Sequence, residues 1–310
     1  MDREAEPLEI LCAVMKMLAQ RGMRKEADAM VSSLLEIHHH LFEAEEYEEA
    51  GDIVTAIQPF LDLQGRLELS KELLKKSIDS RESSNKYVAM GNLALLLNVE
   101  GKWQEALNIC QECLEFFRSI NAKSQMASTI SLQALIYQQR GEYEQALALE
   151  HKTLEIAEEI ECTVVAHSHI AQLLLLMERY DKALKQGEKG LKLAHELGNQ
   201  QFEAAFLHQL GMTLIVLNQP DEAFKRFIKS LAIKEQIGDK EGQADSLSEI
   251  GKLMLVEGQF KEALNCFQQA LNIDRELGNP AKVATALEAI GVIFEKQEHY
   301  EEARIKYQEA

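Results

Sequence analysis

The chain has 310 residues, of which 46% are hydrophobic and 27% charged, so the sequence predicts a packed protein rather than a disordered one. Only four prolines and sixteen glycines occur, which favours long helices over a β fold with many turns. The formal net charge of -18 disfavours nucleic acid phosphates and acidic membrane surfaces as ligands. Two interpretations of this charge stay open: it keeps the protein soluble, or it attracts a partner with a basic surface.

The first residues, Met1 to Glu6, are acidic where a secretory signal would be basic. The longest apolar stretch, near 170–177, is far too short to span a bilayer. The cysteines are scattered and odd in number, which predicts a reduced, cytoplasmic protein. They are Cys12, Cys110, Cys113, Cys162 and Cys266.

A short phrase recurs along the chain, and we call it the turn phrase. It has Gly or a small or polar residue at a turn, an aromatic residue two positions later and Ala five positions later, as in Gly101, Trp103 and Ala106. Its copies begin, in chain order, at 22, 65, 101, 141, 178, 218, 258 and 298. A spacing near 40 residues fits two helices and two short connections, so each copy marks one helix–turn–helix unit.

Residues 1–85 are expected to form two degenerate units. Pro59 lies inside the expected first helix of the second unit, where proline removes a backbone hydrogen bond and should kink or break the helix. A competing copy of the turn phrase runs from Glu45 to Ala50 in a conflicting register. The register between 39 and 85 therefore stays open.

Residues 86–310 are expected to form regular units, the last one incomplete. A small residue seven positions before each turn should let the neighbouring helix approach closely; these are Ala94, Ala134, Ala171, Gly211, Gly251 and Gly291. The Ala of the turn phrase should do the same on the second helix. Gly198, Gly238 and Gly278 suit left-handed caps at helix ends, and Asn279 and Pro280 suit the start of the next helix.

This pattern resembles the tetratricopeptide repeat family, in particular its members with a period near 40 residues. Those occur in kinesin light chains, in Leu-Gly-Asn repeat proteins and in the sensor regions of signalling ATPases. The resemblance covers nearly the whole chain and is strongest from Tyr87 to Ala310. It implies an all-α, right-handed solenoid of about eight stacked helix–turn–helix units.

No catalytic or metal-binding motif stands out. Cys110 and Cys113 form a C-x-x-C pair without a second ligand pair, so we expect both in the core. His38, His39 and His40 point in directions about 100° apart on a helix, which predicts a partly exposed helix end. No Asp or Glu at triad or metal spacing accompanies His167, His169 or His208. We therefore expect no enzyme activity, no metal and no cofactor.

Stacked helix pairs leave a concave groove, and in the resembling family the first helix of each pair lines it. The resemblance implies a set of groove residues: Asn92, Ser131, Ser168, His169, His208, Gln209, Met212, Ser248, Glu249 and Lys252. The asparagine ladder of some relatives is mostly lost, because only Asn92 keeps Asn. The Lys/Asn pattern that grips C-terminal carboxylates is absent too, so chaperone tails are not expected ligands.

The sequence therefore predicts a non-catalytic scaffold that holds a partner protein or peptide. The alternative is a sensor or regulatory arm of a larger signalling NTPase or protease. That alternative rests on the last unit, which stops at Ala310 and should leave apolar surface exposed to a further domain or to a second copy. A freestanding helical enzyme would need converging titratable side chains, and the sequence shows none.

Overall fold

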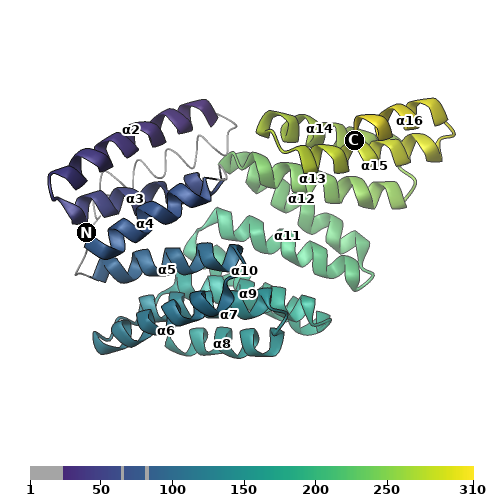
Figure 1. Ribbon diagram of the computed structural model, residues 1–310. Coiled ribbons are helices and arrows are strands. Elements are labelled where there is room, and N and C mark those ends of the chain that lie inside the picture. The colour runs from purple at the N-terminus through teal and green to yellow at the C-terminus, as the bar shows by residue number, and fades with distance from the viewer. Residues whose placement is uncertain (1–23, 64–65, 81–83) are drawn as a thin grey trace. The chain divides into compact units, whose positions relative to one another are not determined.

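The computed structural model describes residues 24–63, 66–80 and 84–310 (Figure 1). Within these ranges the chain forms fifteen α-helices and no strand, which confirms the all-α prediction. Cys12 and the predicted turn positions 22 and 65 lie outside the described residues.

The chain divides into two compact units. The described part of unit 1 is residues 24–63, 66–80 and 84–177, and that of unit 2 is residues 178–310. The helices of unit 1 are α2 (Arg24–Glu43), α3 (Tyr47–Leu63), α4 (Leu67–Ser80), α5 (Ser84–Val99), α6 (Trp103–Ser119), α7 (Lys123–Gln139), α8 (Tyr143–Ile156) and α9 (Ile160–Leu176). Those of unit 2 are α10 (Tyr180–Leu197), α11 (Gln200–Val216), α12 (Pro220–Ile237), α13 (Lys240–Val256), α14 (Phe260–Leu277), α15 (Pro280–Lys296) and α16 (Tyr300–Glu309).

Within each unit, consecutive helices pack against each other as antiparallel neighbours, as α13 and α14 show in Figure 1. The predicted turns join odd-numbered first helices to even-numbered second helices. All six turn positions from 101 onward have a positive φ, which stops one helix and reverses the chain; they are Gly101, Gly141, Glu178, Asn218, Gly258 and Glu298. The turn phrase therefore located these connections correctly.

The predicted small residues lie where two helices approach most closely. A Cβ atom added to Gly211 would lie 2.7 Å from the Phe227 ring, and one added to Gly291 would lie 2.6 Å from the Tyr307 ring. The alanines of the turn phrase are also buried, at no more than 4% exposure, as in Ala106 and Ala303. In these pairs the first helix has a glycine where its second helix inserts an aromatic ring, and this complementarity closes the pair.

The helix ends follow the predicted punctuation. Gly198, Gly238 and Gly278 each end a helix with a φ between 66° and 73°. The Asn279 side chain accepts a hydrogen bond from the backbone N–H of Lys282 at the start of α15. These caps satisfy backbone groups that a helix end leaves without partners.

The first third of the chain differs from one prediction. Helix α3 runs unbroken through Pro59 to Leu63, so the proline does not break the helix. Phe60 and Leu61, which follow it, are buried and hold the last turn of α3 in the core. The competing phrase at 45–50 is a turn as well, because it joins α2 to α3 and Glu45 has a φ of 62°.

In unit 1, successive first helices touch one another directly: α3 contacts α5, α5 contacts α7, and α7 contacts α9. The side of a helix stack on which next-nearest neighbours meet is its inner side. The first helices therefore form the inner face of unit 1.

The described helices include none that is both long and apolar enough to cross a bilayer. In the last helix, α16, Ile305 and Tyr307 are partly exposed, at 46% and 41%.

Candidate partner-binding surface

All ten predicted groove residues lie on first helices. Asn92 is on α5, Ser131 is on α7, and Ser168 and His169 are on α9, all in unit 1. The other six are on α11 and α13 in unit 2: His208, Gln209, Met212, Ser248, Glu249 and Lys252. Lys252 is exposed and the other nine are half-buried, so each has part of its surface open to solvent.

Two predicted groove residues of unit 1 meet at one carboxylate. Glu150 of α8 is only 1% exposed, and its Oε2 atom accepts a hydrogen bond of 3.0 Å from the Ser131 hydroxyl. Its Oε1 atom lies 2.8 Å from Nδ1 of His169. Because a carboxylate only accepts hydrogen bonds, Nδ1 of His169 must carry the hydrogen, which leaves Nε2 free for another contact.

This group, the Glu150 cluster, consists of Ser131, Glu150 and His169. The His169 side chain is 37% exposed, so the buried carboxylate is connected to solvent through it. Burying a carboxylate is costly unless polar groups compensate it, and here two predicted groove residues do so. The cluster thereby fixes the orientation of both.

Sequence reasoning missed Glu150, because it searched only for an Asp or Glu at triad or metal spacing from His169 and found none. The two residues lie 19 positions apart on different helices, so no local motif joins them. A clue did exist. Glu150 stands four positions after the Ala of its turn phrase, where the other units from 101 onward place Cys110, Gly187, Phe227, Phe267 or Tyr307. A Glu in a slot that is otherwise apolar or aromatic indicates a specific partner.

A second polar group lies in unit 2. The Lys234 ammonium of α12, which is buried, donates to the carbonyl of Gly242 at 3.2 Å and to the Ser246 hydroxyl at 3.1 Å. Nδ1 of His208 lies 3.5 Å from the same hydroxyl. Burial, aided by Lys234, lowers the pKa of His208 to about 4, so its ring is neutral at pH 7.

Three further groove residues of unit 2, Glu249, Lys252 and Met212, lie apart from this polar group. Lys252 forms an ion pair of 2.7 Å with Glu249, one helical turn away on α13. Met212 is half-buried and packs against the core around Phe227. These side chains can therefore rearrange around a ligand at small cost.

The other titratable candidates are structural. Cys110 and Cys113 are buried in the core as predicted, and burial raises the pKa of both thiols to about 12. His39 is exposed near the end of α2 and pairs with Glu43 at 3.3 Å. His38, next to it, is buried. In the described ranges no three His, Cys, Asp or Glu side chains come together in a way that could hold a metal ion.

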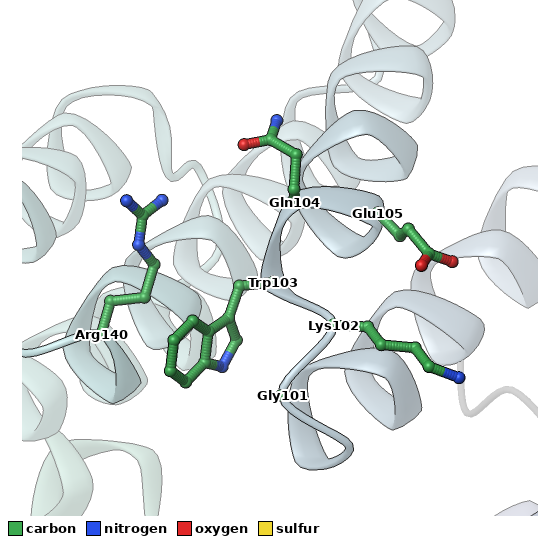
Figure 2. Close-up of a pocket in the computed structure, with 6 residues that line it drawn as sticks. All are labelled: Gly101, Lys102, Trp103, Gln104, Glu105 and Arg140. Atoms are coloured by element: carbon green, nitrogen blue, oxygen red, sulfur yellow. The ribbon is translucent and has the colours of Figure 1, made fainter.

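A pocket of about 440 Å³ lies at the turn between α5 and α6, away from the groove residues. Figure 2 shows the Trp103 indole beside Gly101, on the side of α6 that faces Arg140 at the end of α7. Trp103 is the aromatic residue of its turn phrase, and it is 37% exposed. Its place in the phrase explains it as a packing residue of the turn.

Comparisons with known structures agree with this architecture. A signal transduction ATPase with numerous domains from Pyrococcus horikoshii, which carries a tetratricopeptide repeat sensor, matches with a TM-score of 0.69 and 15% identity, over 98% of this chain and 48% of that one. The apo quorum sensor NprR from B. thuringiensis matches with a TM-score of 0.67 and 17% identity, over 98% and 88%. The Rap protein in complex with Competence and Sporulation Factor matches with a TM-score of 0.62 and 15% identity, over 98% and 96%.

At these identities the structural matches show a shared fold and nothing finer. Among curated protein sequences, no match was found. The tetratricopeptide repeat family model matches five overlapping segments: 85–159, 125–196, 162–236, 202–276 and 242–310. Together these segments cover the chain from 85 to its last residue, so the chain belongs to the tetratricopeptide repeat family.

Proposed function

We propose that this chain is a non-catalytic interaction scaffold that binds an extended segment of a partner protein along the exposed face of its first helices. The observation that carries the proposal is the Glu150 cluster. In this cluster a buried carboxylate orients two side chains, Ser131 and His169, which remain partly open to solvent. A residue that served stability alone would be apolar, as in the equivalent positions of other units.

The chemistry of this face suits a peptide backbone. Asn92 offers a carboxamide, which both donates and accepts hydrogen bonds. Gln209 also carries a carboxamide, but its Oε1 atom is buried, so it presents less of that group. His169 offers Nε2 for a hydrogen bond with the backbone of the partner. Two structural relatives support ligand recognition by this fold: one is a quorum sensor, and the other is a Rap protein complexed with Competence and Sporulation Factor.

A photo-crosslinking amino acid at Asn92 or Ser248 would identify the segment that binds. Isothermal titration of that segment would then measure each side chain. We expect Asn92→Ala and Gln209→Ala to weaken binding by about 0.5–1.5 kcal/mol each, the net value of one hydrogen bond. Glu150→Gln should weaken it by a similar amount, because it loosens His169 without removing a direct contact.

The matched control is Lys189→Ala, an exposed residue on the second helix α10. It should leave the affinity unchanged. Unaltered affinity for a combined Asn92→Ala and Gln209→Ala variant would reject this face as the binding surface.

The finer alternative, a sensor arm of a larger signalling protein, has one observation in its favour. Nearly all of this chain matches less than half of an ATPase that carries a repeat sensor. The encoded sequence downstream of Ala310 decides it, because a nucleotide-binding or protease domain there would support the sensor role and a stop codon would oppose it.

A further inference from the structure

A second surface, separate from the groove residues, lies on unit 2. A pocket of about 560 Å³ opens between the second helices α10 and α12, with one side of α11 beneath it. We call it the Lys229 pocket; its lining is Glu188, Leu191, Lys192, His195, Glu203, Leu207, Arg226, Lys229, Ala232 and Ile233. Glu203 and the groove residue Met212 are nine positions apart on α11, so they point to opposite sides of that helix.

The floor of the pocket is apolar. Leu207 of α11 is buried, and Leu191 and Ile233 from the two walls are half-buried. Ala232 is exposed at the edge and leaves the floor open. An opening of this size over aliphatic side chains can accept one large apolar side chain.

The rim carries unbalanced positive charge. Three Lys or Arg side chains line the pocket against two Glu side chains. Glu188 pairs with Arg226 at 2.6 Å, and Glu203 lies 3.5 Å from His195, which balances its charge only when the ring is protonated. Lys229 makes no ion pair within the described part of the chain. Lys192 has only a loose partner, Glu196 at 3.7 Å, and both of these side chains are at least half exposed.

This charge runs against the rest of the protein. The two walls, α10 and α12, together carry eight Lys or Arg and six Asp or Glu, whereas the whole chain has a net charge of -18. The repeat does not require these cations. One unit later along the chain, Arg226 is replaced by Cys266 and Lys229 by Gln269. A local basic rim in an acidic protein concentrates acidic ligands at that place.

We propose that the Lys229 pocket is a docking site for an acidic protein segment that inserts one large aliphatic or aromatic side chain between α10 and α12. Carboxylates of the segment pair with Lys192 and Lys229, and the inserted side chain covers Leu191, Leu207 and Ile233. A nucleic acid could also pair its phosphates with the two lysines, but it has no aliphatic side chain with which to cover Leu191, Leu207 and Ile233.

The test is a selection from a displayed library of random peptides, about 12 residues long, on the full chain. The selection is repeated on a Lys192→Glu/Lys229→Glu variant and on a control, Lys152→Glu/Lys261→Glu, which makes the same charge change at exposed sites on α8 and α14. We expect the selected peptides to contain Asp or Glu beside a large apolar residue. The wild type and the control should bind them equally, and the pocket variant should bind them at least about tenfold more weakly.

A second variant, Ala232→Trp, tests the apolar floor without changing any charge. It should block the same peptides while circular dichroism shows unchanged helix content. Three outcomes would each overturn the proposal. The selected peptides could bind all variants equally, no selected peptide could lose affinity for the pocket variant, or a single-stranded oligonucleotide could compete with the peptides at equal strength. Asn92→Ala and Gln209→Ala should leave this binding intact, so the result is independent of the groove.

Discussion

At the scale of single residues, a small residue on the first helix of a unit faces a large residue on the second helix. Gly211 faces Phe227 and Gly251 faces Phe267. A Cβ atom added to either glycine would lie too close to the ring, at 2.7 Å for Gly211 and 3.0 Å for Gly251. The unit with the Glu150 cluster has Ala134 in place of the glycine. A glycine inside a helix costs about 0.5–1 kcal/mol relative to alanine, so it is retained where an aromatic ring needs the space.

This matching predicts a strong coupling between positions 134 and 150. Glu150→Phe alone should destabilise the protein by about 1–3 kcal/mol, because the ring would collide with the Ala134 methyl group. Adding Ala134→Gly should recover about 1 kcal/mol or more, even though Ala134→Gly alone costs about 0.5–1 kcal/mol. Urea unfolding of the four proteins measures the coupling, and additive effects of the two changes would contradict the size-matching explanation.

Asp274 of α14 is a buried carboxylate whose stability contribution depends on pH. It is 2% exposed, and its Oδ1 atom has no hydrogen-bond partner in the part of the chain described. Burial raises the pKa of Asp274 to about 6; Lys282 opposes this shift, while Asp245 and Glu241 add to it. The folded state therefore binds a proton more tightly than the unfolded chain, whose carboxyl has a pKa near 3.8.

The sign of the effect follows from this order of pKa values. Above pH 6 the folded state bears the cost of a buried charge, and this cost disappears as the pH falls from 6 towards 3.8. Asp274→Asn should raise the thermal midpoint at pH 7 and give no advantage at pH 4. His208, whose pKa is lowered, makes the folded state less stable as the pH falls, which is the opposite pH dependence. The thermal midpoints of variant and wild type are therefore compared at each pH. As a control, Asp245→Asn breaks a 2.7 Å ion pair with Lys282 and should show no gain at pH 7.

At the scale of elements, all six turns from 101 onward adopt the same left-handed conformation, but only three use glycine. Glu298 has a φ of 64°, and Gly258 has a φ of 76° with open space around it. A side chain in this conformation is strained by roughly 1–2 kcal/mol, partly offset because glycine is more flexible in the unfolded chain. Glu298→Gly should therefore stabilise by about 0.5–1 kcal/mol and Gly258→Glu should destabilise by a similar amount in thermal unfolding. Changes of the same sign in both variants would refute this account.

The elements also show what sequence alone could and could not predict. Turns and caps were predictable, because Gly278, Asn279 and Pro280 act through the local backbone. The continuation of α3 through Pro59 was not predictable, because the burial of Phe60 and Leu61 depends on other helices. The Glu150 cluster and the Lys229 pocket each need side chains from three helices, and their relative positions follow only from the stacking.

At the scale of the whole molecule, the serial order of helix contacts should determine which helices a destabilising substitution affects. In unit 2 the main contacts join each helix to the one before and the one after, so stability is transmitted stepwise from neighbour to neighbour. A protein with a single common core would instead lose protection everywhere at once.

Gly190→Ala tests this property, because the new Cβ atom would lie 2.1 Å from the ring of Phe206, which is buried in α11. Hydrogen exchange followed by mass spectrometry should show faster exchange in α10, α11 and α12, while α15 and α16 keep nearly wild-type protection. Gly91→Ala is the matched control, since no atom lies within 4 Å of its added Cβ and alanine favours the helix. It should slow exchange slightly in α5 or leave it unchanged. Equal acceleration from α10 to α16 in the Gly190→Ala protein would show that unit 2 unfolds as one cooperative body, and the nearest-neighbour description would then fail.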